Sequence, residues 1–408
     1  MTETACSTFE IQDHANYFLS CLRSLHHAYS SLDTTRLTVV YFSVVGLDML
    51  GKLQEVERTH IIDYIYGMQI GLDTNGRNIQ CQECSNPYIE GAGGFLGSSC
   101  AGQPFRTYNE RNSSREPKTS IGIDDCISGF ASYSANSEKM CGCISFEYLQ
   151  SHLAMAYTAV ATLLTLEDDL SRLDKHALIH SIRCAQLSSG AFRATKTGTE
   201  ADMRFVYCAC AISYMLGDWS GVDKNRVVEY VRKCITYEGG MSLIPGGEAQ
   251  GGATFCAVAS LVLMDKLEDI GAASKQALVF WCEQRVQTEG GYNGRTNKDP
   301  DSCYSFWVGA TLEMLGCFNN TDAEPAQKFL LNECQYSKYM GRVGIGGFSK
   351  TPGCQPDILH TFYSIAWLSM ATSRTNRSND SGQVQLYNLR PLFTPLAVCR
   401  EIVAAASM

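Results

Sequence analysis

The stretch GGYNGRTNKDPDSCYSFWVGATL, from Gly290 to Leu312, combines a glycine pair, a polar turn and an apolar run long enough for a helix. Related glycines precede other apolar runs along the chain, at Gly94, Gly190, Gly240, Gly291 and Gly347. The steps between them are 96, 50, 51 and 56 residues, which is a period near fifty with one unit of double length. A fixed period of this size predicts a repeat architecture.

Each unit contains two apolar runs separated by short polar loops. ATFCAVASLVLMDKL and SKQALVFWCEQRVQ, residues 253–267 and 274–287, are examples, and each has the length of a helix. Regular strands with alternating apolar and polar residues are hard to find. The sequence therefore predicts an all-α fold of helical hairpins, one per repeat of about fifty residues, whose period fits an open solenoid and a closed ring equally well.

The composition predicts a globular protein. The chain has 408 residues, of which 45% are hydrophobic, and a formal net charge of -9 with no long basic run. This charge argues against nucleic acid or an anionic membrane as the main partner. The N-terminus lacks the pattern of a signal peptide, and the 19 cysteines lie mostly in apolar runs, so we expect a cytoplasmic protein with reduced thiols.

Residues 1–372 are expected to form one catalytic domain, followed by a polar linker and C-terminal tail over 373–408. A segment rich in Gly, Ser, Asn and charged residues, at about 76–140, predicts a long surface loop inserted into the domain. Four cysteines in or beside this loop are a weaker candidate for a second zinc site: Cys81, Cys84, Cys141 and Cys143.

Asp301, Cys303 and His360 are the strongest candidates for chemistry. Asp301 and Cys303 stand at the entrance of an apolar helix, and His360 stands at the entrance of another helix one repeat later. An Asp that only caps its helix, before a buried Cys, is the structural alternative. A carboxylate, a thiolate and an imidazole form a three-ligand zinc set with an open fourth position, which is the catalytic pattern.

Basic residues lie beside these candidate ligands. Arg295 and Lys298 precede Asp301, and Lys350 precedes His360. Arg contacts phosphate in a bidentate manner, whereas Lys supplies a point charge. Because the cations share a repeat edge with the metal candidates, they favour a phosphate-bearing ligand over a merely solvated loop.

Several segments together resemble the β subunits of the protein prenyltransferases, with the type I geranylgeranyltransferases as the nearest branch. They are GRTNKDPDSCYSFWVGATL, DMRFVYCACAISYML, SSLDTTRLTVVYFSVVGLDML, EDDLSRLDK and GGFSKTPGCQPDILHTFYSIAWLSM. The resemblance extends over roughly residues 15–372, apart from the inserted loop. It implies a closed toroid of paired helices with an apolar cavity and a zinc ion at its rim, held by Asp301, Cys303 and His360.

The resemblance also implies an activity and partners. The chain would be the catalytic subunit of a heterodimer with a prenyltransferase α subunit. It would transfer geranylgeranyl from geranylgeranyl diphosphate to the cysteine of proteins with a C-terminal CaaX sequence ending in a leucine-type residue. Small GTPases of the Rho, Rac and Rap type are the expected protein substrates.

Further roles follow from the same resemblance, residue by residue. The expected diphosphate contacts are Arg295, Lys298, Tyr304, Gln250 and Lys350. The expected isoprenoid contacts are Thr38, Phe42, Tyr157, Arg204, Tyr207, Cys256 and Trp307. The expected peptide contacts are His152, Ala154, Phe205 and Leu359.

Three positions refine the expectation. Thr38 matches a small residue where farnesyl enzymes have a tryptophan, which implies room for a twenty-carbon chain. Lys350 matches a lysine that replaces a magnesium-binding aspartate, so a magnesium requirement is not expected. Gln250 departs from the family, which usually has a histidine there; Gln donates a hydrogen bond but cannot be charged, so weaker stabilisation of the leaving diphosphate is expected.

Two alternatives remain open at this point. One is a silent toroid that binds CaaX-bearing or prenylated proteins, and the other is a sibling farnesyl or Rab-directed transferase subunit. Retention of all three candidate zinc ligands argues against the first. Thr38 and Lys350 argue against farnesyl transfer, and the PDILH context at His360 argues against the Rab-directed type.

Overall fold

The computed structural model describes residues 8–24, 31–32, 34–70, 93–98, 151–288, 290–336, 346–375 and 387–400. Most of the predicted loop at 76–140 lies outside these ranges, and so do the four cysteines in or beside it. None of the described helices combines the length and the apolar character that a membrane crossing requires.

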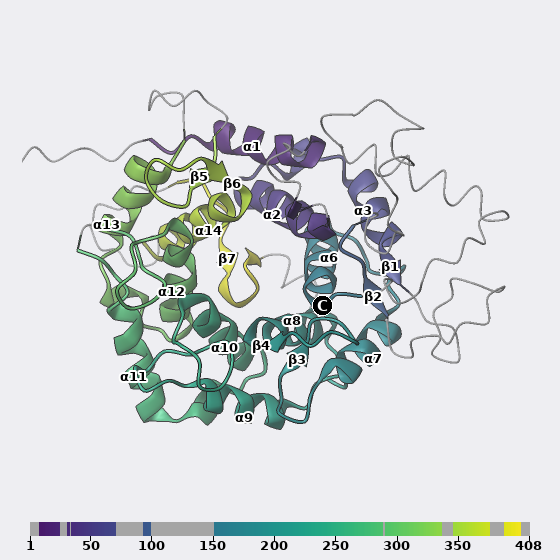
Figure 1. Cartoon of the computed structure of the whole chain (residues 1–408). Helices are drawn as coiled ribbons and strands as arrows, with labels where there is room; N and C mark the ends of the chain where they lie inside the picture. Colours follow the sequence, from purple (N-terminus) through teal and green to yellow (C-terminus); the bar gives the residue numbers. More distant parts are fainter. Residues whose placement is uncertain are drawn as a thin grey trace, which may run out of the picture.

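The described chain is a closed ring of helices in two layers (Figure 1). The inner layer consists of α2 (Arg36–Met49), α6 (Leu153–Thr165), α8 (Met203–Leu216), α10 (Gly251–Leu263), α12 (Ser302–Met314) and α14 (Ile358–Thr375). Each inner helix packs on the next, and α14 packs on α2, so the ring is complete. This closure settles the question that the sequence period left open and confirms the predicted all-α toroid.

The outer layer covers the inner one. It consists of α1 (Ile11–Arg23), α3 (Arg58–Gly67), α7 (Lys175–Ala185), α9 (Lys224–Cys234), α11 (Ala272–Glu283) and α13 (Ala323–Lys328), which continues as a π-helical turn, Phe329–Cys334. Inner helices are apolar on nearly all sides; in α2 all residues except Thr38 are buried. Outer helices bury only one face, as α9 does with Val227, Val228 and Val231.

Short connections complete the fold. Two-residue antiparallel strands pair as β1 with β2 (Gln69–Ile70, Gly94–Phe95), β3 with β4 (Phe192–Arg193, Ala201–Asp202), β5 with β6 (Phe348–Ser349, Pro356–Asp357) and β7 with β8 (Leu392–Phe393, Val398–Cys399). Single turns of 3-10 helix are η2 (Leu53–Glu55), η4 (Leu267–Ile270), η5 (Phe318–Asn320) and η8 (Thr394–Leu396).

The repeated glycines allow neighbouring hairpins to approach closely. Gly239 has φ +98°, and a Cβ there would lie 2.5 Å from the carbonyl oxygen of Ala277 on the next outer helix. Gly346 has φ +68°, and its Cβ would lie 2.1 Å from the carbonyl oxygen of Asp13 on α1. The last glycine pair therefore packs on the first helix of the chain, which joins the two ends of the ring.

A second periodic contact aligns the inner helices. The backbone N–H at the first turn of one inner helix donates to a carbonyl in the connection that precedes the next inner helix. The bonds run from Leu37 to Gly97, Leu153 to Ala194, Met203 to Leu243, Gly251 to Gly294 and Ser302 to Lys350. The N-termini of the inner helices consequently gather at one end of the toroid.

The predicted tail is packed against the ring where the structure describes it. Its β7–β8 hairpin lies within the outline of the ring in Figure 1. The carbonyl oxygen of Leu396 accepts hydrogen bonds from Tyr157 and Tyr41 on inner helices, at 3.0 and 3.4 Å. Arg390 forms an ion pair with Asp48 of α2, which is fully buried. Residues 387–400 therefore belong to the folded domain.

Candidate metal centre and aromatic cluster

Asp301, Cys303 and His360 converge at the entrances of two neighbouring inner helices. Their potential ligand atoms all lie within 4.8 Å of one another, and they are the one group of three such residues found among the described residues. Asp301 is the N-cap of α12 and accepts a hydrogen bond from the Cys303 N–H at 3.0 Å. Because that N-cap is extended backbone, residues two apart in sequence face the same site.

Asp357 orients the imidazole from behind. Its Oδ2 lies 2.6 Å from Nδ1 of His360, and its Oδ1 accepts the His360 N–H at 3.0 Å. The Nε2 of His360 lies 3.2 Å from Oδ1 of Asp301. An imidazole whose far nitrogen bonds a carboxylate is the usual arrangement at protein metal sites. Sequence analysis did not select Asp357, although its place in PDILH, three residues before His360, is the signal that identifies it.

Burial and the neighbouring carboxylates shift the protonation of this cluster. Burial raises the pKa of the Cys303 thiol well above its usual value, and Asp301 adds to the effect. Burial alone would lower the pKa of His360, but hydrogen bonds to Asp301 and Asp357 outweigh it and raise the pKa to about 9. Burial opposes ionisation of Asp301, yet the contact with His360 holds the pKa of Asp301 below its usual value.

The cluster suits zinc. Carboxylate, thiol and imidazole are ligands that Zn²⁺ accepts together, and three protein ligands leave one position free. Asp301 and Cys303 are only 7% and 6% exposed. Burial of an ionised carboxylate is costly unless the group is paired or coordinates a metal, so the burial of Asp301 next to a thiol agrees with a metal site. The second carboxylate, Asp357, completes the support that a zinc-binding histidine needs.

The candidate diphosphate contacts differ in their partners: Lys350 lies next to Asp301, whereas Tyr304 and Arg295 are bonded to other residues. Lys350 places Nζ 3.8 Å from Oδ2 of Asp301. The hydroxyl of Tyr304 accepts a hydrogen bond from Nε2 of Gln250 at 2.7 Å. Arg295 is bound to Glu248 at 2.6 Å, a partner that sequence analysis missed, and Lys298 is exposed on the same turn as Arg295.

Gln250 has two roles in this arrangement. It is the N-cap of α10, where its Oε1 accepts the Ala253 N–H at 2.8 Å. Its amide nitrogen is thereby directed to Tyr304. Gln250 thus fixes both a helix end and the tyrosine hydroxyl.

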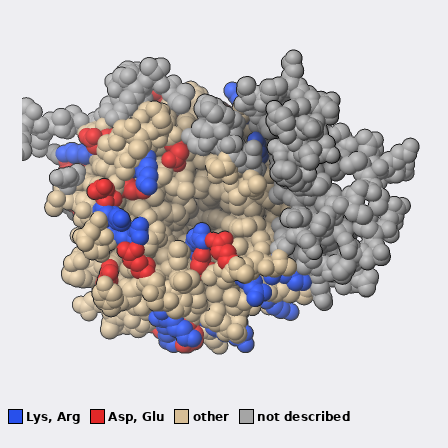
Figure 2. Space-filling model, in the orientation of Figure 1, with Lys and Arg blue, Asp and Glu red and all other residues tan. Residues whose placement is uncertain are grey.

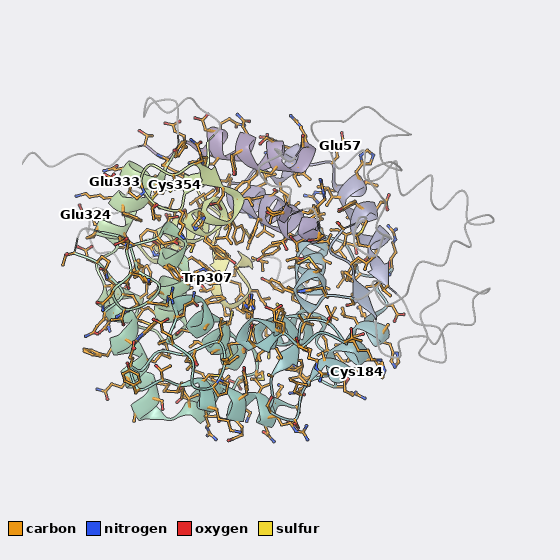
Figure 3. All side chains as sticks on the ribbon, viewed as in Figure 1. Glu57, Cys184, Trp307, Glu324, Glu333 and Cys354 are labelled. Carbon is orange, nitrogen blue, oxygen red and sulfur yellow. The ribbon has the colours of Figure 1, made fainter. Side chains whose placement is uncertain are left out.

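Aromatic side chains dominate the middle of the ring. Trp307 of α12 packs on Tyr363 of α14 with ring centroids 4.1 Å apart, and Phe255 of α10 lies 4.9 Å from Trp307. Figure 3 shows Trp307 at the inner wall of the ring, whereas Cys184 lies at the outer edge. The central part of the face in Figure 2 is mainly uncharged, with acidic and basic side chains in mixed groups around it.

The other isoprenoid candidates fall into two groups. Phe42, Tyr157, Tyr207 and Cys256 are buried residues of inner helices, and Thr38 of α2 bonds Met155 of α6 at 3.7 Å. Arg204 is different: its guanidinium pairs with Asp202 and Glu200 at 2.6 and 2.5 Å, and its side chain is half exposed. The aromatic neighbours Tyr41, Phe255, Phe362 and Tyr363 were not predicted from the sequence.

The peptide candidates belong to three inner helices. His152, the N-cap of α6, has its ring 5.7 Å from that of Phe205 on α8, in an edge-to-face arrangement. Burial lowers the pKa of His152, so the ring is neutral at physiological pH. Ala154 is half-buried near them, and Leu359 is exposed beside His360.

Comparisons with known proteins agree on one family. A family model of the prenyltransferase α/α-toroid domain matches residues 9–394. The geranylgeranyl transferase type-1 subunit beta of Arabidopsis thaliana is 36% identical over 372 residues, covering 89% of this chain and 85% of the relative. The corresponding subunit of Dictyostelium discoideum is 33% identical over 358 residues, covering 87% and 89%.

A structural comparison gives the same fold. The Candida albicans protein geranylgeranyltransferase-I complexed with GGPP matches 98% of both chains with a TM-score of 0.72. The sequence identity is 20%, so this likeness concerns the fold alone.

Proposed function

This chain belongs to the prenyltransferase α/α-toroid family, and from that premise we propose that it is the catalytic β subunit of a zinc-dependent protein geranylgeranyltransferase type I. The reaction would transfer geranylgeranyl from geranylgeranyl diphosphate to the cysteine thiol of a CaaX protein. The convergence of Asp301, Cys303 and His360 beside a cluster of aromatic side chains on the inner helices is the observation that most directly supports this proposal.

Asp301, Cys303 and His360 would hold the zinc ion, with Asp357 fixing the imidazole. When bound there, Zn²⁺ would lower the pKa of a substrate thiol at its open position and so supply a nucleophile at neutral pH. Lys350 lies close to Asp301. The resemblance matches Lys350 to a lysine that replaces a magnesium-binding aspartate, so the reaction would not need magnesium.

The chain's own cations and hydroxyl would stabilise the leaving group. As the bond between the substrate sulfur and C1 forms, the bond between C1 and oxygen breaks, and the electron pair leaves with the diphosphate. Negative charge therefore grows on the diphosphate, where Arg295, Lys298 and the Tyr304 hydroxyl would act electrostatically. Gln250 would hold the Tyr304 hydroxyl in place.

Substrate choice would follow from the shape of the cavity. Trp307 and the neighbouring aromatic rings offer an apolar, rigid wall to the isoprenoid, and Thr38 occupies little space on α2. Neutral His152 against Phe205 suits an apolar side chain such as leucine at the end of the peptide. The α subunit and the Rho-, Rac- or Rap-type substrates are the partners that this function requires.

The test is prenyl transfer by this chain co-produced with a prenyltransferase α subunit. A CaaX peptide ending in Leu is incubated with geranylgeranyl diphosphate and a magnesium chelator that spares zinc, and the adduct is detected by mass. We expect a geranylgeranyl adduct that is lost in Cys303→Ala. Cys317→Ala is a matched control, because Cys317 is a half-buried thiol at the other end of α12.

Absence of the adduct from a folded, zinc-loaded complex would reject the transferase proposal. Binding of the CaaX peptide without transfer would instead favour the silent toroid. A farnesyl adduct formed in preference to geranylgeranyl would assign the chain to the sibling farnesyl activity.

A further inference from the structure

The turn that contains Arg295 and Lys298 leads directly into the metal candidate Asp301. Its two sides meet through a bridge between Asn293 and Pro300, and the Lys298 N–H donates to the Arg295 carbonyl at 3.3 Å. The turn is exposed along most of its length. Side chains at a solvent-exposed turn hold a fixed direction only when other contacts anchor the backbone.

Thr296, between the two cations, provides such an anchor. Its hydroxyl oxygen accepts a hydrogen bond from Nη1 of Arg285 at 3.1 Å. The same hydroxyl donates to Oε2 of Glu238 at 3.1 Å. One hydroxyl thus joins a cation that precedes Gly291, just past the end of α11, to a carboxylate that precedes Gly240.

The two partners of Thr296 are themselves held by Trp281. Trp281 is 2% exposed, and the guanidinium of Arg285 lies 4.9 Å from the centroid of its ring. Nε1 of Trp281 donates to Oε2 of Glu238 at 3.4 Å. Arg285 is only 5% exposed, so its charge is buried on the side of the turn that faces the outer helices.

Further bonds tie Arg285 to the base of the turn. The Arg285 carbonyl accepts the Asn293 N–H at 2.9 Å, and the Asn293 side chain donates to the Lys298 carbonyl at 3.1 Å. The cluster of Trp281, Arg285, Glu238 and Thr296 therefore holds the turn at two points, through the Thr296 hydroxyl at its tip and through the Asn293 backbone at its base. A buried charge in such a network is costly to displace, which makes the anchor rigid.

We infer that Thr296 is a positioning residue for the isoprenoid diphosphate, acting through the turn that presents Arg295 and Lys298. Thr296 itself need not touch the diphosphate. Its hydroxyl, held between Arg285 and Glu238, fixes the distance from both cations to the metal centre. This inference rests on the proposed function, because it assigns the bound anion as the diphosphate of the isoprenoid substrate.

The test compares Thr296→Val, which keeps the shape and removes the hydroxyl, with Thr296→Ser, which keeps the hydroxyl. Binding of geranylgeranyl diphosphate to the zinc-loaded complex is followed by tryptophan fluorescence, and geranylgeraniol is the matched ligand without a diphosphate. Thr321→Val is the control variant, since the Thr321 hydroxyl bonds the Tyr292 phenol at 3.3 Å and the Phe318 carbonyl at 3.2 Å, and these bonds do not involve Thr296, Arg285 or Glu238.

We expect Thr296→Val to bind geranylgeranyl diphosphate about tenfold more weakly, because the variant loses the hydroxyl bonds to Arg285 and Glu238 that hold the turn and its two cations in place. Binding of geranylgeraniol, zinc content and the KM for the peptide should not change. Thr296→Ser and Thr321→Val should behave as the wild type does.

Three results would overturn the inference: wild-type diphosphate affinity in Thr296→Val, equal loss of geranylgeraniol binding, or failure of Thr296→Ser to restore affinity. The second result would show general damage to the cavity. A wild-type complex that does not bind geranylgeranyl diphosphate at all would reject the proposed function itself, before any variant is measured.

Discussion

At the scale of single residues, the candidate centre depends on groups that bind one another before any metal does. Asp301 and Asp357 contact opposite nitrogens of His360, and Cys303 is a buried thiol next to them. Asp301, Cys303 and His360 were predicted from the sequence because their residue types and helix-entrance positions match a zinc set. Asp357 was not, since a carboxylate before a helix is most often a cap.

Asp357→Asn is expected to weaken zinc binding. The amide keeps the size of the carboxylate but loses the charge that directs Nδ1 of His360 and makes the ring a better ligand. We expect a loss in zinc affinity of about 10- to 100-fold, measured by competition with a chromophoric chelator. Asp322→Asn, which alters the N-cap of α13 and no metal candidate, is the control. Unchanged zinc affinity in Asp357→Asn would remove this role from Asp357.

Zinc affinity should rise steeply with pH. Below the pKa of about 9 that His360 has without metal, its imidazole is protonated, and the Cys303 thiol is protonated as well. Zinc must displace both protons, so between pH 6 and 8 the affinity should increase by about two decades per pH unit. Proton release measured in weakly buffered solution on zinc addition checks this, and release of no proton would contradict it.

At the scale of elements, every inner helix begins at the same end of the ring, and the candidate residues lie at these beginnings. His152, Gln250 and Asp301 are N-caps of α6, α10 and α12. Helix N-termini have unpaired N–H groups and a partial positive charge, which suits an anionic ligand. The outer helix α1 has a different task, because its His14 joins the first repeat to the last.

His14 should make stability fall at mildly acidic pH. Its Nδ1 accepts the Gly347 N–H at 3.0 Å and its Nε2 lies 2.9 Å from Oε1 of Gln335, so the ring is neutral with its proton on Nε2. Complete burial lowers the pKa of His14 to about 4. In the unfolded chain His14 has a pKa of about 6.5, so below this pH it binds a proton in the unfolded chain but not in the folded one. The free energy of unfolding that depends on neutral His14 is therefore fully present above pH 6.5, and about 3 kcal/mol of it is lost progressively as the pH falls to 4.

The measurement is denaturant unfolding of wild type and His14→Gln between pH 8 and pH 4.5. Gln can donate and accept hydrogen bonds as neutral His does, but it does not titrate. The wild type should lose more stability than His14→Gln over this interval. Parallel curves for the two proteins would show that His14 does not cause the pH dependence.

At the scale of the whole molecule, closure of the ring joins residues more than 300 positions apart. Gly346 packs on Asp13, and Gln335 bonds His14. The C-terminal hairpin adds a further long-range contact, since Leu396 accepts hydrogen bonds from inner helices. The closure of the ring therefore depends on both ends of the described chain.

Gly346→Ala should destabilise the ring strongly. Gly346 and Gly217 have similar left-handed backbones, with φ +68° and +65°, but only at Gly346 would a Cβ meet another helix, 2.1 Å from the Asp13 carbonyl oxygen. Gly217→Ala thus measures the backbone cost alone, about 1 kcal/mol. We expect Gly346→Ala to cost about 3 kcal/mol or more in the free energy of unfolding. Equal losses of unfolding free energy in the two variants would show that the chain at Gly346 can move away from α1 without destabilising the ring.

The sequence by itself determined the repeat, the helical hairpins and the three candidate metal ligands. These properties are local: a glycine where hairpins meet, an apolar run of helical length, and a carboxylate and thiol at one helix entrance. Because each unit packs on its neighbour in the same way, the repeat appears directly in the spacing of the residues. The resemblance then extended this pattern to a family, which the comparisons confirmed.

Only the tertiary structure decided how these units meet across the ring. Closure depends on the angle between successive hairpins, which no single repeat records. The partners Asp357, Glu248 and Glu238 were missed because surface carboxylates are common and their distances to His360, Arg295 and Thr296 arise only on folding. The packing of residues 387–400 was missed for the same reason. Tyr41 and Tyr157 donate to the backbone carbonyl of Leu396, and a backbone acceptor produces no recognisable pattern in the sequence.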